Sequence, residues 1–133
     1  MVDVELTRVY GIVGFYRVEG EEKKTPFGGY FEYDPDTDFV IGERIDAECG
    51  SALFAGKIDN KLHSLRFNLR YAGRRDEIYY AYRREGDVWV GEFKLHEAGK
   101  ITSKGTSLCN ISRSGALPKT LEARGLGFPI FLE

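Results

Sequence analysis

The chain has 133 residues, of which 42% are hydrophobic, which is enough for one hydrophobic core and too little for two domains. Its 19 basic and 21 acidic residues are interspersed and give a formal net charge of −2, which argues against a nucleic-acid-binding surface and a polybasic membrane patch. No apolar run approaches a membrane span and the first residues do not resemble a secretory leader, so we expect a cytoplasmic protein without nucleic-acid or membrane partners.

The chain contains two cysteines, Cys49 and Cys109. They lie sixty residues apart and have neither CxxC nor zinc-site spacing. A reducing compartment leaves such cysteines as thiols, so we expect no disulfide. The two histidines, His63 and His96, fall at opposite ends of their expected strands. The sequence therefore predicts no metal site, and no cofactor.

Short runs of residues alternate between apolar and polar side chains and are separated by turn signals, a pattern typical of antiparallel β-structure. Tyr and Phe together supply 17 residues and Gly supplies 16. The expected strands cover residues 5–18, 26–33, 39–46, 51–58, 62–71, 76–85, 87–97 and 101–112. The connections between them are too short for parallel crossovers, so neighbours in sequence should pair antiparallel.

Glycines inside the strands indicate where a curved sheet bends or packs closely. They recur in Val40-Ile41-Gly42-Glu43, Phe54-Ala55-Gly56-Lys57 and Trp89-Val90-Gly91-Glu92. We therefore predict an all-β fold, an up-and-down meander of about eight strands over residues 5–112 that closes into a barrel within a single domain, 1–133. An open twisted sheet covered by the C-terminal tail is the alternative.

The pairing register follows from the requirement that apolar side chains share one face. The expected cross-strand neighbours include Phe31 with Ile41, Glu43 with Phe54, Phe54 with Phe67, Phe67 with Tyr80, Tyr82 with Trp89, and, on the outer face, Arg70 with Glu77. The phase of the first and eighth strands stays open because both of their faces are mixed.

This register places Glu43 in the middle of the apolar interior. An unpaired buried carboxylate is costly, and its pKa tends to rise. Glu43 is therefore a candidate for fixing a ligand or transferring a proton, with Tyr80 as its hydrogen-bond partner. A bulge in the third strand that turns Glu43 to solvent is the alternative interpretation.

One end of the expected interior is more polar than the rest and is the candidate mouth of the barrel. The residues that the register places there are Tyr33, Phe39, Ile58, His63, Arg84 and Asp87. Arg offers a planar donor group and His a titratable ring, so this end is suited to an anionic or polar group of a ligand. A solvated rim with an Arg84–Asp87 cross-strand pair is the other interpretation.

The meander resembles the calycin-like barrels, which include lipocalins, avidins and fatty-acid-binding proteins. The resemblance is one of architecture, because Gly11-Ile12-Val13-Gly14-Phe15 stands where lipocalins carry a Gly-x-Trp motif and the only tryptophan is Trp89. It implies that a small apolar ligand is held in the lumen.

The pattern changes after Ser114. Residues 116–125 predict a short helix, with Pro118 in its first turn and Gly125 just past its end. Residues 128–132 (FPIFL) are strongly apolar, so we expect them to pack against another apolar surface instead of being exposed to water. They are expected to plug the far end of the barrel, to cover a gap between the first and last strands, or to assemble a homo-oligomer.

The function that these observations favour is non-catalytic binding of a small apolar or amphipathic molecule in the lumen. The expected ligand-binding residues are Glu43, Tyr80, Tyr82, Trp89, His63, Arg84 and Tyr33. Two alternatives remain. One is a structural or protein-interaction module with a filled core and tail-mediated assembly, and the other is an isomerase- or cyclase-like barrel that uses Glu43 and Tyr80 as acid and base.

Overall fold

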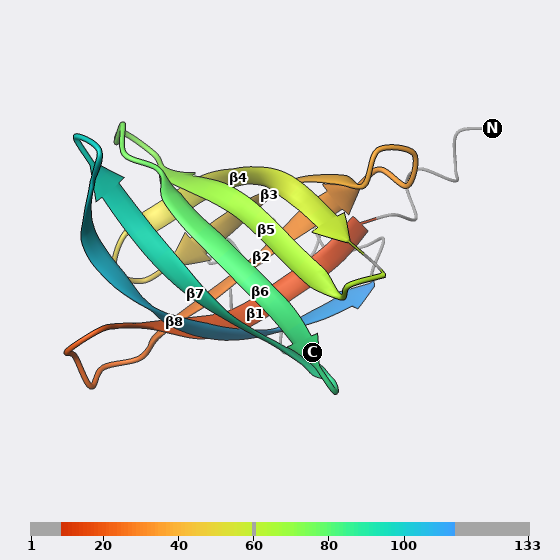
Figure 1. Ribbon diagram of the computed structural model, residues 1–133, viewed down its shortest axis with the longest axis horizontal. Helices are drawn as coiled ribbons and strands as arrows, with labels where there is room; N and C mark the ends of the chain where they lie inside the picture. The colour runs from red at the N-terminus through yellow and green to blue at the C-terminus, as the bar shows by residue number, and fades with distance from the viewer. Residues whose placement is uncertain (1–8, 60, 114–133) are drawn as a thin grey trace.

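The protein is an eight-stranded antiparallel barrel (Figure 1). The structure, a computed structural model, describes residues 9–59 and 61–113. The strands are β1 (Val9–Val18), β2 (Thr25–Tyr33), β3 (Phe39–Asp46), β4 (Gly50–Asp59), β5 (Ser64–Tyr71), β6 (Ile78–Glu85), β7 (Val88–Glu97) and β8 (Lys100–Arg113). Each strand pairs with the next along the chain, which confirms the predicted all-β meander.

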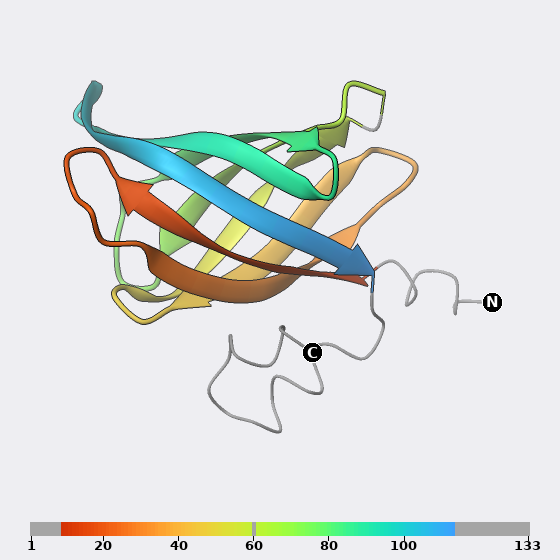
Figure 2. The same ribbon diagram turned by 90° about the horizontal axis from the view of Figure 1, so that it is seen from below.

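The barrel is closed by a ladder between its first and last strands. β1 pairs with β8 from Tyr10 opposite Arg113 to Val18 opposite Gly105. Figure 2 shows these two strands side by side along the length of the molecule. The ladder excludes the open twisted sheet, and it gives the fold the calycin-like up-and-down architecture that the sequence suggested.

Tight turns fix the registers of the hairpins. The turn between β7 and β8 consists of Ala98 and Gly99, which both have positive φ (53° and 81°). Such a turn matches the right-handed twist of the strands it joins. A longer turn follows β4, where the Asp59 carboxylate accepts hydrogen bonds from the backbone N–H groups of Lys61 (2.9 Å) and Leu62 (3.0 Å).

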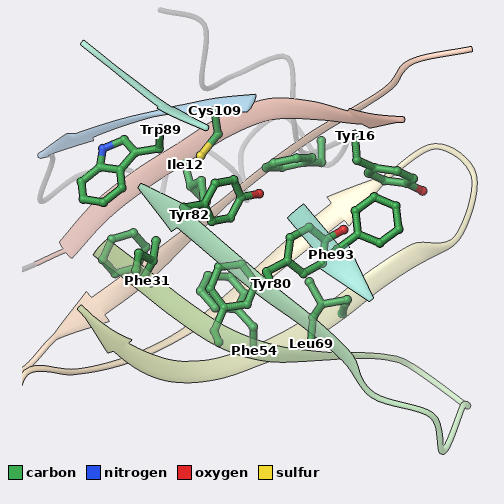
Figure 3. Packing of buried hydrophobic residues seen from close by; sticks show 14 of the residues in the cluster. Ile12, Tyr16, Phe31, Phe54, Leu69, Tyr80, Tyr82, Trp89, Phe93 and Cys109 are labelled. Carbon is green, nitrogen blue, oxygen red and sulfur yellow. The ribbon is translucent and has the colours of Figure 1, made fainter. Parts of the chain in front are cut away.

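Alternate residues of every strand point inward and form one apolar core (Figure 3). The buried hydrophobic residues of this cluster are Ile12, Tyr16, Phe27, Phe31, Val40, Ala52, Phe54, Leu65, Phe67, Leu69, Tyr71, Tyr80, Tyr82, Trp89, Phe93 and Cys109. Glycines opposite the large rings make the packing feasible. A Cβ at Gly91 would lie 2.7 Å from the Tyr82 ring, and one at Gly105 would lie 2.5 Å from the Phe93 ring.

The predicted register of β3 is wrong by one residue. Phe31 pairs with Gly42 and not with Ile41, and Phe54 also pairs with Gly42 and not with Glu43. Because side chains alternate across a strand, this slip turns every residue of β3 to the opposite face. Glu43 is exposed, its Oε1 accepts a hydrogen bond from the Tyr30 hydroxyl (3.3 Å), and the side chain that enters the core is Arg44.

The other predicted registers keep the correct face. The pairing of β5 with β6 is confirmed, with Phe67 opposite Tyr80, and so is the outer ion pair between Arg70 and Glu77 (2.7 Å). The β4–β5 and β6–β7 ladders are displaced by two residues from the prediction, so that Phe54 lies opposite Leu69 and Phe93 opposite Tyr80. A displacement of two residues leaves each side chain on its predicted face.

The remaining predictions fall on other parts of the chain. β1 begins at Val9, and residues 5–8 of the predicted first strand lie outside the described residues. The predicted helix at 116–125 and the apolar segment 128–132 also lie outside them. Within the described residues, no helix has the length and apolar character needed to cross a lipid bilayer.

Candidate functional site

A pocket opens at the end of the barrel where β2, β4, β6 and β8 finish. We call this end the mouth. The pocket has a volume of about 430 Å³. It is lined by Tyr10, Phe31, Tyr33, Ile58, Arg84, Asp87, Trp89 and Ile111. These residues come from six strands and one turn, and the up-and-down topology brings them together because alternate strands end at the same side of the barrel.

Aromatic rings form the apolar part of this mouth pocket. Tyr10 stacks on Phe31 with ring centroids 5.4 Å apart, and Tyr33 meets Tyr10 edge to face at 6.3 Å. The Tyr33 hydroxyl donates a hydrogen bond to Oδ1 of Asp38 (2.7 Å), which fixes the orientation of its ring. Trp89 is 8% exposed. The pocket therefore presents the faces of aromatic rings, fixed in orientation, against which an apolar ligand can pack.

Two opposite charges stand at the rim of the mouth pocket. Arg84 is the penultimate residue of β6 and Asp87 lies in the following turn. Nε of Arg84 donates to the carbonyl of Gly86 (3.0 Å), and its backbone N–H donates to the carbonyl of His63 (2.8 Å). The rim therefore presents a cationic donor and a carboxylate acceptor to whatever enters the pocket.

The structure brings together part of the predicted binding set. Tyr33, Arg84 and Trp89 line the mouth pocket. His63 does not, because it occupies a turn with positive φ (54°) and its side chain is exposed. Glu43 lies on the outer face of the barrel. The predicted acid–base pair of Glu43 and Tyr80 is therefore wrong, since the barrel wall separates the two side chains.

Five lining residues were not among the predicted binding residues, although two of them, Ile58 and Asp87, were predicted to lie at the mouth. Phe31 was assigned to the interior without a binding role, and the phases of the strands that carry Tyr10 and Ile111 were left open. Tyr10, Ile12 and Tyr16 of β1 share the inner face, but Val13 and Phe15 on the other face are also apolar, so the sequence does not distinguish the two faces.

Stacked rings fill the middle of the barrel below the pocket. Phe54 lies 4.4 Å from Phe67, Phe67 lies 5.2 Å from Tyr80, and Tyr80 lies 5.8 Å from Tyr82, measured between ring centroids. The Tyr82 hydroxyl shares a hydrogen bond with Oγ of Ser107 (2.7 Å), so its polar atom has a buried partner. Tyr80 and Tyr82 thus belong to the core and not to the lining of the pocket.

A charged network occupies the opposite, far end of the interior. Arg44 is 0% exposed, and its Nη2 donates hydrogen bonds to the hydroxyls of Tyr71 and Tyr80, each at 2.9 Å. The Tyr71 hydroxyl donates in turn to Oδ2 of Asp46 (2.5 Å). Oδ1 of Asp46 accepts the backbone N–H groups of Glu48 (2.9 Å) and Cys49 (2.7 Å). Arg44 and Asp46 are therefore joined through a tyrosine.

Aromatic faces surround the rest of the Arg44 guanidinium. Its Cζ lies 4.2 Å from the centroid of Phe27, 4.7 Å from Tyr80 and 5.4 Å from Tyr16. Nε and Nη1 have no hydrogen-bond partner among the described residues. Cation–π attraction is stronger in a desolvated site, and here it takes the place of those missing hydrogen bonds.

The ionisation of the interior follows from burial. Burial lowers the pKa of Arg44, but its interactions with Tyr80, Tyr71 and Tyr82 outweigh this effect, so the pKa lies above its ordinary value and the guanidinium stays charged. Burial raises the pKa of Tyr71, Tyr80 and Tyr82. The tyrosines therefore act as neutral hydrogen-bonding groups.

The two cysteines are free thiols. Burial raises the pKa of Cys109 to about 12, so this thiol is protonated at neutral pH and is a poor nucleophile. Cys49 is half-buried, and its Sγ lies 3.9 Å from the Tyr16 hydroxyl. In the described ranges no cluster of three or more His, Cys, Asp or Glu residues is placed to hold a metal ion.

Comparison with known proteins gives no relative from which a function can be transferred. No protein family, no curated protein and no solved structure matches the chain. The function must therefore be inferred from the pocket and its chemistry.

Proposed function

We propose that the protein binds a small, amphipathic molecule in the mouth pocket without transforming it. The observation that carries this proposal is the combination of an aromatic hollow and a charged rim at the mouth, where the described core side chains leave space. Its volume of about 430 Å³ falls within the usual range of small-molecule sites.

The lining suggests how the ligand is oriented. An apolar and preferably planar part packs against Tyr10, Phe31 and Trp89, where stacking and area burial both contribute. A polar group at the other end of the ligand lies between Arg84 and Asp87, so a group that both accepts and donates hydrogen bonds satisfies the two side chains together. We also propose a cytoplasmic location, a compartment in which Cys49 and Cys109 would stay reduced.

The filled middle of the barrel supports a second candidate, a structural or protein-interaction module. Phe54, Phe67, Tyr80 and Tyr82 occupy the space that a long ligand of a larger barrel would use. A ligand of this protein must therefore be short enough to stay at the mouth, and if the mouth binds nothing the module is the better description.

Native mass spectrometry of freshly purified protein, followed by titration with 1-anilinonaphthalene-8-sulfonate, tests the proposal. The probe joins a planar apolar body to an acidic group. Ile111→Phe fills the mouth pocket and should weaken probe binding about tenfold, the equivalent of about 1.4 kcal/mol. Ile101→Phe, the same change at a 51% exposed position of the same strand, should leave binding unchanged.

Two results would contradict the proposal. One is a probe affinity that Ile111→Phe and Ile101→Phe change equally. The other is a probe that binds without altering the fluorescence of Trp89, the only tryptophan and a wall of the pocket.

A further inference from the structure

The outer face of the barrel carries an apolar stripe that is largely exposed among the described residues, although Lys57 lies over its Phe39 end, with Nζ 5.5 Å from the ring centroid. We define the outer stripe as Phe39 and Ile41 of β3 with Leu53 and Ala55 of β4. Phe39, Ile41 and Leu53 are 52%, 65% and 62% exposed. Ile41 pairs directly with Ala55, so the four residues are contiguous across the ladder. Contiguous exposed apolar residues of this kind indicate a surface that binds another segment or molecule.

The outer stripe continues into a hollow on the outside of β3, β4 and β5. The hollow has a volume of about 680 Å³ and includes Ile41, Leu53 and Ala55. Arg70 and Arg74 lie at its border, toward the far end of the barrel. Arg70 forms an ion pair with Glu77 (2.7 Å), whereas the guanidinium of Arg74 lies 5.9 Å from the ring of Tyr71. The lining of the hollow is mainly apolar but also includes Glu43 and the Arg70–Glu77 ion pair. Among the described residues, Arg74 is the cation at its border that forms no ion pair.

The chain itself contains a segment with the complementary chemistry. Residues 128–132 (FPIFL) are apolar and Glu133 follows them. Two of the covers expected for this segment are removed by the fold, because the β1–β8 ladder leaves no gap to cover and the Arg44 network fills the far end of the interior. The mouth pocket has a charged rim, which suits an apolar segment less well than the outer stripe does.

The distances allow residues 128–132 to reach the outer stripe. β8 ends with Arg113 at the mouth, and β3 begins with Phe39 at the same end of the barrel. Around the barrel, β8 and β3 are three strand spacings apart, which is about 15 Å at about 4.8 Å per spacing. The 14 residues from 114 to 127 span up to about 45 Å when extended, at about 3.3 Å per residue.

We propose that residues 128–132 of the same chain dock on the outer stripe, with Glu133 directed toward Arg74. The segment enters beside Phe39 at the mouth end and runs toward Leu53, which brings its acidic end to the cationic border of the hollow. The tail then covers the outer face of β3 and β4 and leaves the mouth pocket open.

Disulfide trapping in the full chain tests this docking. In a Cys49→Ser background, Leu53→Cys is combined with Ile130→Cys, and the intramolecular disulfide is measured in a glutathione buffer. The matched control combines Thr106→Cys, on the outer face of β8, with the same Ile130→Cys. Tail docking should raise the effective concentration of the first pair about tenfold above that of the control, although Thr106 lies nearer in sequence to the tail.

The proposed contact between Glu133 and Arg74 is tested by a variant and a matched control. Arg74→Glu should lower the yield of the Leu53→Cys/Ile130→Cys disulfide several-fold, whereas Arg75→Glu, at the next exposed position, should not change it. Apart from the half-buried Cys49, the substituted positions are exposed or in the tail, and circular dichroism checks that each variant is folded.

Three outcomes would overturn the proposal. Equal yields for the Leu53 and Thr106 pairs show that the tail has no preferred site. Disulfides that form mainly between chains assign the outer stripe to a second copy. A higher yield for an Arg84→Cys/Ile130→Cys pair places the tail at the mouth.

Discussion

Each end of the barrel interior has an arginine, which is buried at the far end and exposed at the mouth. At the far end, Arg44 enters the core, where two tyrosine hydroxyls and three aromatic faces meet it. At the mouth, Arg84 stays on the rim beside Asp87 and a hollow remains below it. At the far end, the inward-pointing side chains bond to one another and fill the interior. At the mouth, Arg84 lies at the end of its strand and does not fill the interior. Among the described residues, the side chains of the far end are therefore packed together, whereas a hollow remains at the mouth, where we propose that a ligand binds.

The largest effect is expected from alkaline titration of the buried tyrosines. Burial holds the pKa of Tyr16, Tyr71, Tyr80 and Tyr82 above 10 in the folded protein, whereas an unfolded chain ionises near 10. Because the folded chain then holds more protons than the unfolded one, the free energy of unfolding is highest below pH 10 and falls as the pH rises above it. Cys109 adds to the loss between its ordinary pKa of 9.0 and about 12.

Tyrosinate absorbance and circular dichroism recorded together measure this effect. We expect the four buried tyrosines to ionise only as the barrel unfolds. A single transition near pH 10 in a protein that stays folded would show that the interior is accessible to solvent.

Removal of the buried charge should have the next largest effect. Arg44→Met leaves the hydroxyls of Tyr71 and Tyr80 without their donor and breaks the link to Asp46. Loss of one member of a buried charged network typically costs about 3–5 kcal/mol. Arg66→Met, at an exposed position of β5, should change the free energy of unfolding by less than about 0.5 kcal/mol. Urea denaturation measures both, and similar values for the two variants would contradict a structural role for the network.

A smaller loss should follow removal of the hydroxyl that joins the two charges. Tyr71→Phe deletes the group that accepts from Arg44 and donates to Asp46, and an unsatisfied buried polar group costs about 1–3 kcal/mol. Tyr79→Phe on the neighbouring strand provides the control, because its side chain points to the outer face. The network would be dispensable if both substitutions shifted the urea midpoint equally.

The mouth should show the smallest change in stability and a clear change in binding. Arg84→Ala removes an exposed side chain, so we expect less than about 0.5 kcal/mol in the free energy of unfolding. If its guanidinium holds the acidic group of the probe, the dissociation constant of 1-anilinonaphthalene-8-sulfonate should rise about tenfold. Arg83→Ala, one residue away on the outer face, should leave both quantities unchanged. An Arg84→Ala variant with unaltered affinity would remove the rim from the proposed site.

Strict alternation decided which strands were predicted correctly. In β5, Leu65, Phe67 and Leu69 alternate with Arg66, Asn68 and Arg70, so one face is apolar and the other polar. The register of β5 with β6 could therefore be read from the sequence. The two-residue displacement of β4 against β5 arises from a longer turn, and Asp59, whose carboxylate caps that turn, is the signal that the sequence carried for it.

β3 misled the prediction because both of its faces are mixed. One face carries Phe39, Ile41, Glu43 and Ile45, and the other carries Val40, Gly42, Arg44 and Asp46. Counting apolar residues favours the first face, but the second is inside. The groups that make burial of Arg44 tolerable come from β5 and β6, far away in the sequence, and Gly29 lies directly across from Arg44. No local pattern contains that information.

The mouth was predictable in part for a simple geometric reason. Tyr33, Ile58 and Arg84 lie at strand ends, where the inner rows become more polar, and that change is visible in the sequence. Tyr10 and Ile111 could not be assigned to the mouth from the sequence. They lie on β1 and β8, which pair with each other although they are about a hundred residues apart in the chain.

The β1–β8 ladder has a consequence for the route by which the chain folds. Every other ladder joins neighbours in sequence and can form as a local hairpin, but Tyr10 must find Arg113 across nearly the whole described chain. The entropy of closing so long a loop is lost before the contacts of the ladder compensate for it, so we expect closure to be the late, rate-limiting event. Pulse-labelling hydrogen exchange should find the β1 and β8 amides protected after those of β5 and β6.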